Sequence, residues 1–176
     1  MLGCILETRV RGLRTSGRIV EVEAYVGPHD PAAHGYGNRR SERNRRLFGP
    51  PGTAYVYFIY GMHWCFNAVT EQEGFPAAVL VRALEPLNGI EVMQRRRGTT
   101  DLKGLCAGPG RLCRALGITG AFDGVSLESE RLRILPSPSA RKRIITSPRV
   151  GITNAAEWPL RFCLKGSEWL SRAERG

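Results

Sequence analysis

Two acidic residues separated by one position, Glu21 and Glu23, lie within the stretch "GRIVEVEAYVG". Apolar residues alternate here with period two, so we predict a strand at about residues 18–26. Both glutamates then share a face with Ile19 and Tyr25. The opposite face is apolar, with Val20, Val22, Ala24 and Val26. The simplest interpretation of paired glutamates on such a strand is a face exposed to solvent.

A basic residue, Arg82, interrupts the apolar stretch "AAVLVRAL". A buried guanidinium is costly unless an acid pairs with it. We therefore expect Arg82 to face a glutamate of the strand at about 18–26. Such a pair would also suit a site that orients a water molecule against a carboxylate base.

Aromatic residues concentrate in "TAYVYFIYGMHWCFN", which runs from Thr53 to Asn67. This stretch holds three of the chain's five tyrosines and two of its six phenylalanines, together with a tryptophan and a histidine. We predict a hairpin at about residues 53–69 with its turn at "YGMH", because Gly61 permits a sharp turn. The prediction places aromatic side chains at one hairpin tip.

The other elements that would position these residues are short. We predict a third strand at 77–84 and helices after Pro86, in "PLNGIEVMQRRRG", and after Pro109, in "PGRLCRALGI". From about Val125 strand-like pieces are broken by "PSPS", "SP" and "WP". Because β-α-β alternation and composition breaks are both missing, we predict an α+β fold. It would be a single compact domain over residues 1–176, with a mixed or antiparallel curved sheet, short helices and a protruding β-hairpin.

The charge balance indicates a polyanionic partner. The 176 residues include 26 Lys+Arg and 16 Asp+Glu, for a formal net charge of +10 and a pI near 10.0. Such a field favours nucleic acid first and an acidic membrane surface second. Only three of the basic residues are lysines. Arginine suits bidentate contacts to phosphate, although a GC-rich genome explains the same bias equally well.

Cysteine spacing and hydropathy argue against a disulfide-bonded, zinc-binding, secreted or membrane-spanning protein. The five cysteines never occur as C-x-x-C, which favours neither a disulfide framework nor a zinc site. The opening "MLGCIL" is too short for the core of a signal peptide. No apolar run approaches the length of about 18 residues that a membrane span needs. We expect a soluble intracellular protein without a metal or another cofactor.

Several segments together carry a resemblance to a known family. They are "GRIVEVEAYVGPHDPAAH", "RNRRLFGPPGTAYVYFIYGMHWCFN" and "VLVRALEP", followed by "LCAGPGRLC" and by "RVGI" at 149–152. In order and spacing, the chain resembles the alkyladenine (3-methyladenine) DNA glycosylase family from about Gly17 to its C-terminus. Members flip a damaged purine nucleotide out of duplex DNA and hydrolyse its N-glycosidic bond. Their substrates are alkylated or deaminated purines of the 3-methyladenine, 7-methylguanine and hypoxanthine type.

The resemblance implies roles for individual residues of a base pocket. Glu23 matches the general base, and Arg82 matches the residue that helps hold the attacking water. Three residues match those that stack on or edge the flipped base: Tyr25, His34 and Tyr57. Asn67 matches the residue that crowds the exocyclic amino group of guanine. Glu21 has no such counterpart, and we assign it to structural support.

The resemblance also explains the aromatic tip. Flipping leaves a hole in the base stack, and an aromatic wedge can fill it from the minor groove. Tyr60 matches the family's intercalating tyrosine, with Met62 and His63 as flanking contacts. A two-residue loop would put Tyr57 and Asn67 on opposite faces of the hairpin, whereas a three-residue loop or a bulge would put them together. Because both belong to one pocket, we predict the latter.

The motif segments contain no lysine, which argues against a Schiff-base nucleophile. We therefore expect a monofunctional glycosylase without a lyase step. Arginines in two stretches are candidates for phosphate contacts: Arg39, Arg40, Arg43, Arg45, Arg46 and Arg95 to Arg97. The turn "AGPG" before a helix could also present backbone N–H groups to a phosphate.

Two departures from the family pattern and two other interpretations remain. Asn38 stands where a second glycine is common, and the family's further helix before "LLG" is missing ahead of Met1-Leu2-Gly3.

A non-catalytic basic nucleic-acid-binding module would share the charge and the hairpin but has no use for Glu23 with Arg82. A peripheral membrane protein needs a longer amphipathic helix than "GIEVMQRRRG". We expect a monomer that binds double-stranded DNA with damaged purines and no membrane, in the cytoplasm or nucleoid of a prokaryote or the nucleus of a eukaryote.

Overall fold

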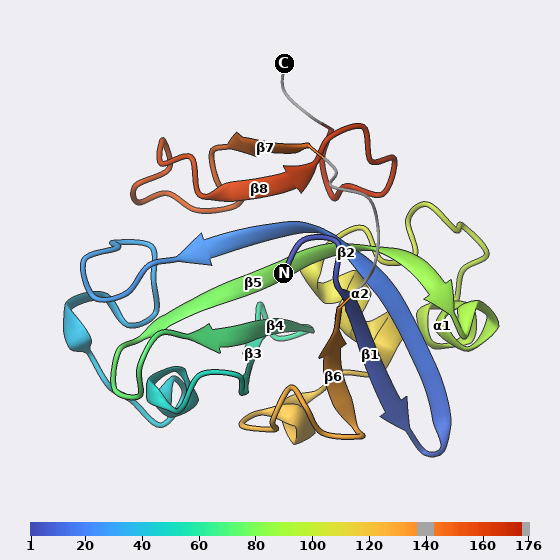
Figure 1. Cartoon of the computed structure of the whole chain (residues 1–176), viewed down its shortest axis with the longest axis horizontal. Helices are drawn as coiled ribbons and strands as arrows, with labels where there is room; N and C mark the ends of the chain where they lie inside the picture. The colour runs from blue at the N-terminus through green and yellow to red at the C-terminus, as the bar shows by residue number, and fades with distance from the viewer. Residues whose placement is uncertain (137–142, 174–176) are drawn as a thin grey trace.

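The chain folds around a curled antiparallel sheet (Figure 1). A computed structural model describes residues 1–136 and 143–173. Within these ranges the strand order is β3-β4-β5-β2-β1-β6, and a β7–β8 pair joins β2. The strands are β1 (Ile5–Val10), β2 (Leu13–Tyr25), β3 (Ala54–Ile59), β4 (His63–Thr70), β5 (Ala77–Asn88), β6 (Leu132–Leu135), β7 (Ile144–Ser147) and β8 (Arg161–Leu164).

Two α-helices and three 3-10 helices complete the described fold. They are α1 (Ile90–Arg97), α2 (Pro109–Leu116), η1 (Tyr36–Asn38), η2 (Arg45–Phe48) and η3 (Gly120–Phe122). Helix α2 has Pro109 in its first turn, and its apolar side packs against β4 and β5. The predicted α+β class, with one compact domain and a curved antiparallel sheet, is confirmed.

The main hydrophobic core lies between the sheet and α2. Its buried members include Leu6, Ile19, Val22, Phe66, Val81 and Leu84 from the strands and Leu112, Cys113, Ala115 and Leu116 from α2. Of the apolar face predicted from alternation at residues 18–26, only Val22 belongs to this core.

Strand β2 carries a bulge beside the two glutamates. The register with β5 shifts between Ile19 and Glu21, which makes Val20 an extra residue. Ile19 and Val22 therefore both lie in the main core, whereas Val20 packs in a separate cluster with a residue of β8. The predicted division of the strand, with Val20 beside Val22 and Ile19 opposite them, is wrong at Ile19 and Val20 for this reason.

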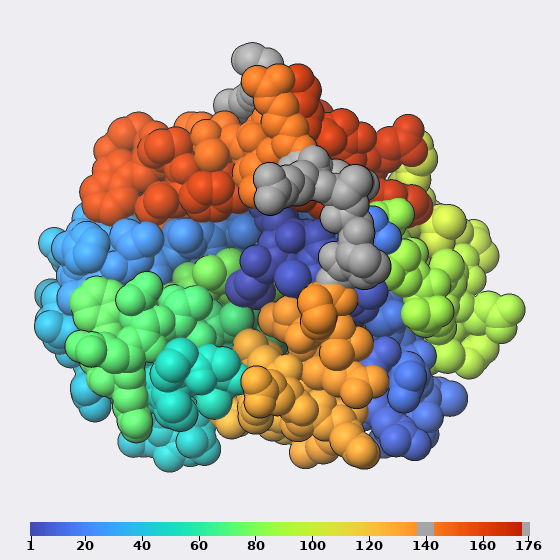
Figure 2. All heavy atoms as spheres, in the orientation of Figure 1, coloured from blue at the N-terminus to red at the C-terminus, as the bar shows by residue number. Residues whose placement is uncertain are grey.

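The glutamates are buried, so the interpretation of a solvent-exposed face is wrong. Glu21 and Glu23 each have 0% exposure. Strand β8 pairs with β2 along this segment, placing Cys163 opposite Glu21 and Arg161 opposite Glu23. In Figure 2 the described residues after 143, coloured orange to red, gather along one edge of the molecule against the blue N-terminal strands.

Some predicted boundaries need correction. The strand predicted at 18–26 begins at Leu13 and forms a hairpin with β1, which was not predicted. The strand predicted at 77–84 continues to Asn88 through Pro86, which lies at an irregularity where the missing N–H is tolerated. The break expected at "PSPS" falls, after Pro136, outside the described residues.

Four of the five cysteines are buried: Cys65, Cys106, Cys113 and Cys163. The fifth, Cys4, is half-buried, and no disulfide joins the cysteines. Within the described ranges, no helix has both the length and the apolar character needed to cross a membrane.

Candidate active site

The β3–β4 hairpin turns through a loop of three residues, Tyr60, Gly61 and Met62. Ile59 pairs with His63 on either side of this loop. The predicted three-residue loop is therefore confirmed. Tyr60 and Gly61 both adopt left-handed backbone conformations, with φ of 53° and 67°, and Tyr60 is 79% exposed. Glycine adopts this conformation freely, which suits the sharp turn.

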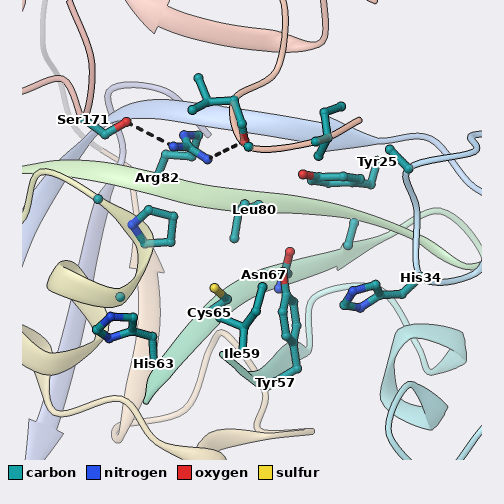
Figure 3. A pocket seen from close by; sticks show the side chains of 18 of the residues that line it. Tyr25, His34, Tyr57, Ile59, His63, Cys65, Asn67, Leu80, Arg82 and Ser171 are labelled. Atoms are coloured by element: carbon teal, nitrogen blue, oxygen red, sulfur yellow. Dashed lines mark hydrogen bonds between the residues drawn. The ribbon is translucent and has the colours of Figure 1, made fainter. Parts of the chain in front are cut away.

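The same register brings the predicted pocket residues of the hairpin together. Tyr57 pairs with Cys65, and Tyr55 pairs with Asn67. Directly paired residues of an antiparallel hairpin point to one face. Tyr55, Tyr57, Cys65 and Asn67 therefore form one side of a cavity (Figure 3).

Neighbouring segments brace the exposed tip. The rings of Phe58 and Trp64 lie 4.7 Å apart between centroids, and Arg43 donates to the carbonyl of Phe58 at 2.9 Å. His63 packs on Gly110 of α2, where an added Cβ would come within 2.9 Å of the His63 ring. The tip is thus solvent-exposed but anchored at its base.

The cavity behind this hairpin has a volume of about 590 Å³. It is lined by five of the residues predicted for base binding and catalysis: Tyr25, His34, Tyr57, Asn67 and Arg82. Tyr60 and His63 also contribute to its lining. Met62 does not line the cavity, and its side chain is 67% exposed at the hairpin tip.

The aromatic wall of the cavity is held by ring contacts and hydrogen bonds. The ring of His34 lies 4.5 Å from that of Tyr57 in an edge-on arrangement, and His34 Nδ1 is 2.7 Å from the hydroxyl of Tyr55. Burial, assisted by the nearby charge of Arg43, lowers the pKa of His34, which favours a neutral imidazole. Asn67 donates its amide to the carbonyl of Tyr55 at 3.1 Å, which fixes its orientation.

Glu23 lies behind this wall, and both its oxygens accept hydrogen bonds. Its Oε1 accepts from the backbone N–H of Val150 at 2.6 Å and lies 3.3 Å from Nη1 of Arg82. Its Oε2 accepts from the hydroxyl of Tyr25 at 3.0 Å. Burial and the adjacent Glu23 raise the pKa of Tyr25, so its hydroxyl remains a donor. Glu23 therefore reaches the cavity through Tyr25 and Arg82.

Glu21 has the surroundings of a structural carboxylate. Its Oε1 accepts from Nε of Arg82 at 3.0 Å, from Nε of Arg161 at 2.8 Å and from the hydroxyl of Ser171 at 2.8 Å. The backbone N–H of Ser171 donates to Oε2 at 2.6 Å. Burial acts to raise the pKa of Glu21, but hydrogen bonds from Arg161 and Ser171 outweigh it and hold the pKa below its usual value.

Arg82 lies within ion-pair distance of both glutamates, whereas the sequence predicted its pairing with one. It lies at the register shift between Glu21, which pairs with Ala83, and Val22, which pairs with Val81. Its guanidinium also donates to the hydroxyl of Ser171 at 3.3 Å (Figure 3). At this irregularity the side chain of Arg82 contacts both carboxylates and lines the cavity.

Other cavity residues were not predicted. They include Leu47, Tyr55, Cys65, Leu80, Val150, Gly151, Ile152, Ser171 and Arg172. A signal existed for Tyr55, which is two positions from Tyr57 on the same strand, but Ser171 and Arg172 lie in a segment without a motif. The "AGPG" turn lines the cavity through Ala107, Gly108, Pro109 and Gly110.

The predicted phosphate-contacting arginines do not all have free side chains. Arg96 donates to the carbonyl of Ala115, and Arg97 donates to the carbonyl of Leu105. Arg40 lies over the ring of Phe48 at 4.3 Å. Part of the arginine-rich composition therefore stabilises helix ends and loops rather than an open surface.

Comparisons with known proteins show the family of this chain. The family model described as "Methylpurine-DNA glycosylase (MPG)" matches residues 1–168. The chain belongs to this family. Its members are DNA glycosylases, hydrolases that act on N-glycosidic bonds, and the match includes the strand β1 that lies before the resemblance seen in the sequence.

Three relatives of this methylpurine-DNA glycosylase family member illustrate the similarity. A protein of Methanoculleus marisnigri is 52% identical over 176 residues, covering 98% of this chain and 90% of the relative. One of Rhodopseudomonas palustris strain HaA2 is 52% identical over 158 residues, covering 88% and 76%. One of Bacillus cereus strain G9842 is 48% identical over 186 residues, covering 98% and 91%. All three carry the name "Putative 3-methyladenine DNA glycosylase".

Proposed function

We propose that this protein is a DNA-repair glycosylase that flips alkylated or deaminated purines out of duplex DNA and hydrolyses their N-glycosidic bonds. The supporting observation is one aromatic cavity lined by Arg82 and by the exposed Tyr60, with the buried Glu23 behind its wall in contact with Tyr25 and Arg82. The proposed substrates are 3-methyladenine, 7-methylguanine and hypoxanthine, and the proposed active form is a monomer.

In this proposal Tyr60 fills the hole left by the flipped nucleotide. An exposed ring on a braced hairpin can enter the base stack without a rearrangement of the fold. Met62, the last residue of the loop, and His63, the first residue of β4, would contact the flanking nucleotides. The unstacking of a base costs a few kcal/mol, which the inserted ring offsets in part.

The flipped purine would lie between the aromatic walls of the cavity. Tyr25, His34 and Tyr57 offer ring faces and edges that accept bases of different shape. An N-alkylated purine carries positive charge and gains from the electron-rich face of a tyrosine. Asn67, with its amide held by the carbonyl of Tyr55, would exclude guanine by crowding its exocyclic amino group.

Glu23 would activate the attacking water. A carboxylate has about four acceptor sites, and among the described residues two donors reach Oε1 and one reaches Oε2. One site on Oε2 is left for a water molecule. As water attacks C1′, its proton would pass to Glu23, while the electron pair of the breaking C1′–N bond leaves with the base. Arg82, which lines the cavity beside Glu23, would hold the water.

The proposed enzyme is monofunctional. A lyase step through a Schiff base requires an amine nucleophile, and no lysine of the described chain lines the cavity. The product would be an intact strand with an abasic site.

The direct test uses end-labelled duplexes with one hypoxanthine, one 7-methylguanine or no lesion. We expect strand cleavage at the lesion only after alkali treatment, which breaks abasic sites. Cleavage without alkali would contradict the monofunctional mechanism. Binding to the lesion duplexes without any abasic product would instead favour a non-catalytic module.

A further inference from the structure

A second buried ion pair lies beside the cavity, formed by Asp30 and Arg149. Both side chains are fully buried, and two hydrogen bonds of 2.5 and 2.8 Å join the guanidinium to the carboxylate. Asp30 Oδ1 also accepts from the backbone N–H of Ala32 at 3.0 Å. Burial acts to raise the pKa of Asp30, but the bonds from Arg149 and Ala32 outweigh it and lower the pKa, so the carboxyl is ionised.

This pair joins the segment after Pro148 to the strand that carries the proposed base. Arg149 donates to the carbonyl of Ala24 at 3.0 Å. The next residue, Val150, donates its backbone N–H to Glu23 Oε1 at 2.6 Å. The position of this donor therefore depends on how Arg149 is held.

The pair also lies against the base-binding wall. The guanidinium carbon of Arg149 is 4.7 Å from the ring centroid of Tyr25, and Tyr25 lines the cavity. An unpaired guanidinium behind this ring would repel a cationic base and would compete for the electrons of the ring face. Asp30 neutralises the charge of Arg149 beside the ring of Tyr25.

We propose that Asp30 and Arg149 are positioning residues with two effects, both of which rest on the proposed function. Arg149 holds the Val150 N–H against Glu23, and Asp30 neutralises Arg149 so that the cavity accepts cationic purines. The pair thereby contributes to the preference for alkylated bases over neutral ones without touching the base.

The experiment compares single-turnover excision of 7-methylguanine, which is cationic, and hypoxanthine, which is neutral. In Asp30→Asn the charge of Arg149 is left unpaired, so we expect excision of 7-methylguanine to fall at least about tenfold more than that of hypoxanthine. In the double variant Asp30→Asn, Arg149→Gln both charges are gone. We expect it to restore the ratio between the two substrates to within about twofold of the wild-type ratio while both rates stay low.

Arg149→Lys is the matched variant that keeps the positive charge but loses the bidentate hydrogen bonding to Asp30. We expect both excision rates to fall by a similar factor while binding of the lesion duplexes changes little, because Val150 is no longer held. Equal losses on both substrates in Asp30→Asn would overturn the electrostatic effect, and wild-type rates in Arg149→Lys would overturn the positioning effect.

Two controls separate the possible failures. Melting temperatures of all variants are measured first, and excision is assayed well below the lowest of them. If Asp30→Asn does not fold, the Arg149→Lys result decides on positioning, and Arg149→Gln alone is used for the charge. In Arg149→Gln we expect excision of 7-methylguanine to fall less than excision of hypoxanthine. A greater fall for 7-methylguanine than for hypoxanthine would contradict the proposal. If the wild-type protein excises neither base, the proposed function itself fails.

Discussion

At the scale of single residues, the different donors around Glu21 and Glu23 predict different roles for two chemically identical side chains. Glu21 accepts from two arginines and twice from Ser171, which lies in the segment after β8. Glu23 accepts from Tyr25, which lines the cavity. Alternation along the strand could not distinguish them.

Glu23→Gln is therefore expected to remove activity without loss of the fold. The amide keeps the shape and can still accept hydrogen bonds, but it cannot take a proton from water. Single-turnover excision should fall by about 100-fold or more, while binding to a lesion duplex survives. Near-normal excision would mean that the base lies elsewhere.

Glu21→Gln is the matched control two positions away. It leaves Arg82 and Arg161 buried with less compensating charge, and breaking a buried pair costs about 3–5 kcal/mol. We expect a lower melting temperature by circular dichroism, and an excision rate that is less affected than in Glu23→Gln at temperatures where the variant is folded. If Glu21→Gln kept full stability but lost excision, Glu21 would be the base and Glu23 the structural carboxylate.

Acid should destabilise the protein through Glu21 and Asp30. Both have a pKa held below its ordinary value in the folded state, so their contribution to the free energy of unfolding is complete above the unfolded pKa of about 4. It is lost as the pH falls from there through the lower folded values. Melting temperatures from pH 7 to pH 2 should be level at first and then decline steeply below about pH 4; a protein equally stable at pH 2.5 and pH 6 would contradict this assignment.

At the scale of elements, the exposed position of Tyr60 on the hairpin tip allows its contribution to base flipping to be measured apart from its contribution to stability. Tyr60→Ala removes a ring that is 79% exposed, so the melting temperature should change little. Lost stacking of about 1–3 kcal/mol should weaken flipping instead. The loss of excision should be large for a lesion in a stable paired duplex and smaller in a mismatch or an A·T-rich context. A fluorescent base beside the lesion would follow flipping directly.

The outcome that would contradict this role of Tyr60 is an equal loss in all sequence contexts. A fall in melting temperature large enough to explain the loss would do the same. Either result would make Tyr60 a structural residue of the turn.

The hairpin also shows what sequence patterns predict well at this scale. Its limits follow from local patterns, and its three-residue loop, with Tyr57 and Asn67 on one face, follows from the single pocket that the family resemblance implies. The bulge at Val20 does not, because an extra residue is fixed by the partner strand and not by its own neighbours. Strand β1 was not predicted for a similar reason, because its extended structure depends on its pairing with β2 and β6 and not on a pattern in its own residues.

At the scale of the whole molecule, the net charge of +10 should dominate binding to undamaged DNA. Affinity for an undamaged duplex should fall steeply with salt, and about six phosphate contacts would give roughly a 10³-fold loss between 50 and 200 mM. Arg45→Gln should make this dependence shallower. Arg9→Gln on β1, which β2 and β5 separate from the hairpin strands in the sheet, should have a smaller effect. An affinity that barely responds to salt would contradict this reading.

The long-range contacts of the site mark the limit of sequence prediction. The motif residues from Glu23 to Arg82 could be assigned from local segments that resemble a known family. Arg149, Arg161 and Ser171 could not, because their partners lie more than a hundred positions away. Such pairings depend on how β8 and the segments before and after it pack against β2, which no local pattern specifies.

The burial of the cysteines has a consequence for survival under chemical stress. Reagents that methylate DNA bases also methylate thiolates, and burial raises the pKa of Cys65 and Cys113 and that of Cys106 to about 12. These side chains remain as weakly nucleophilic thiols. An enzyme with the proposed substrates would thus resist the agents that create them. Intact-mass analysis after treatment with a methylating reagent should find the half-buried Cys4 modified first, and early methylation of Cys65 in the folded protein would refute this protection.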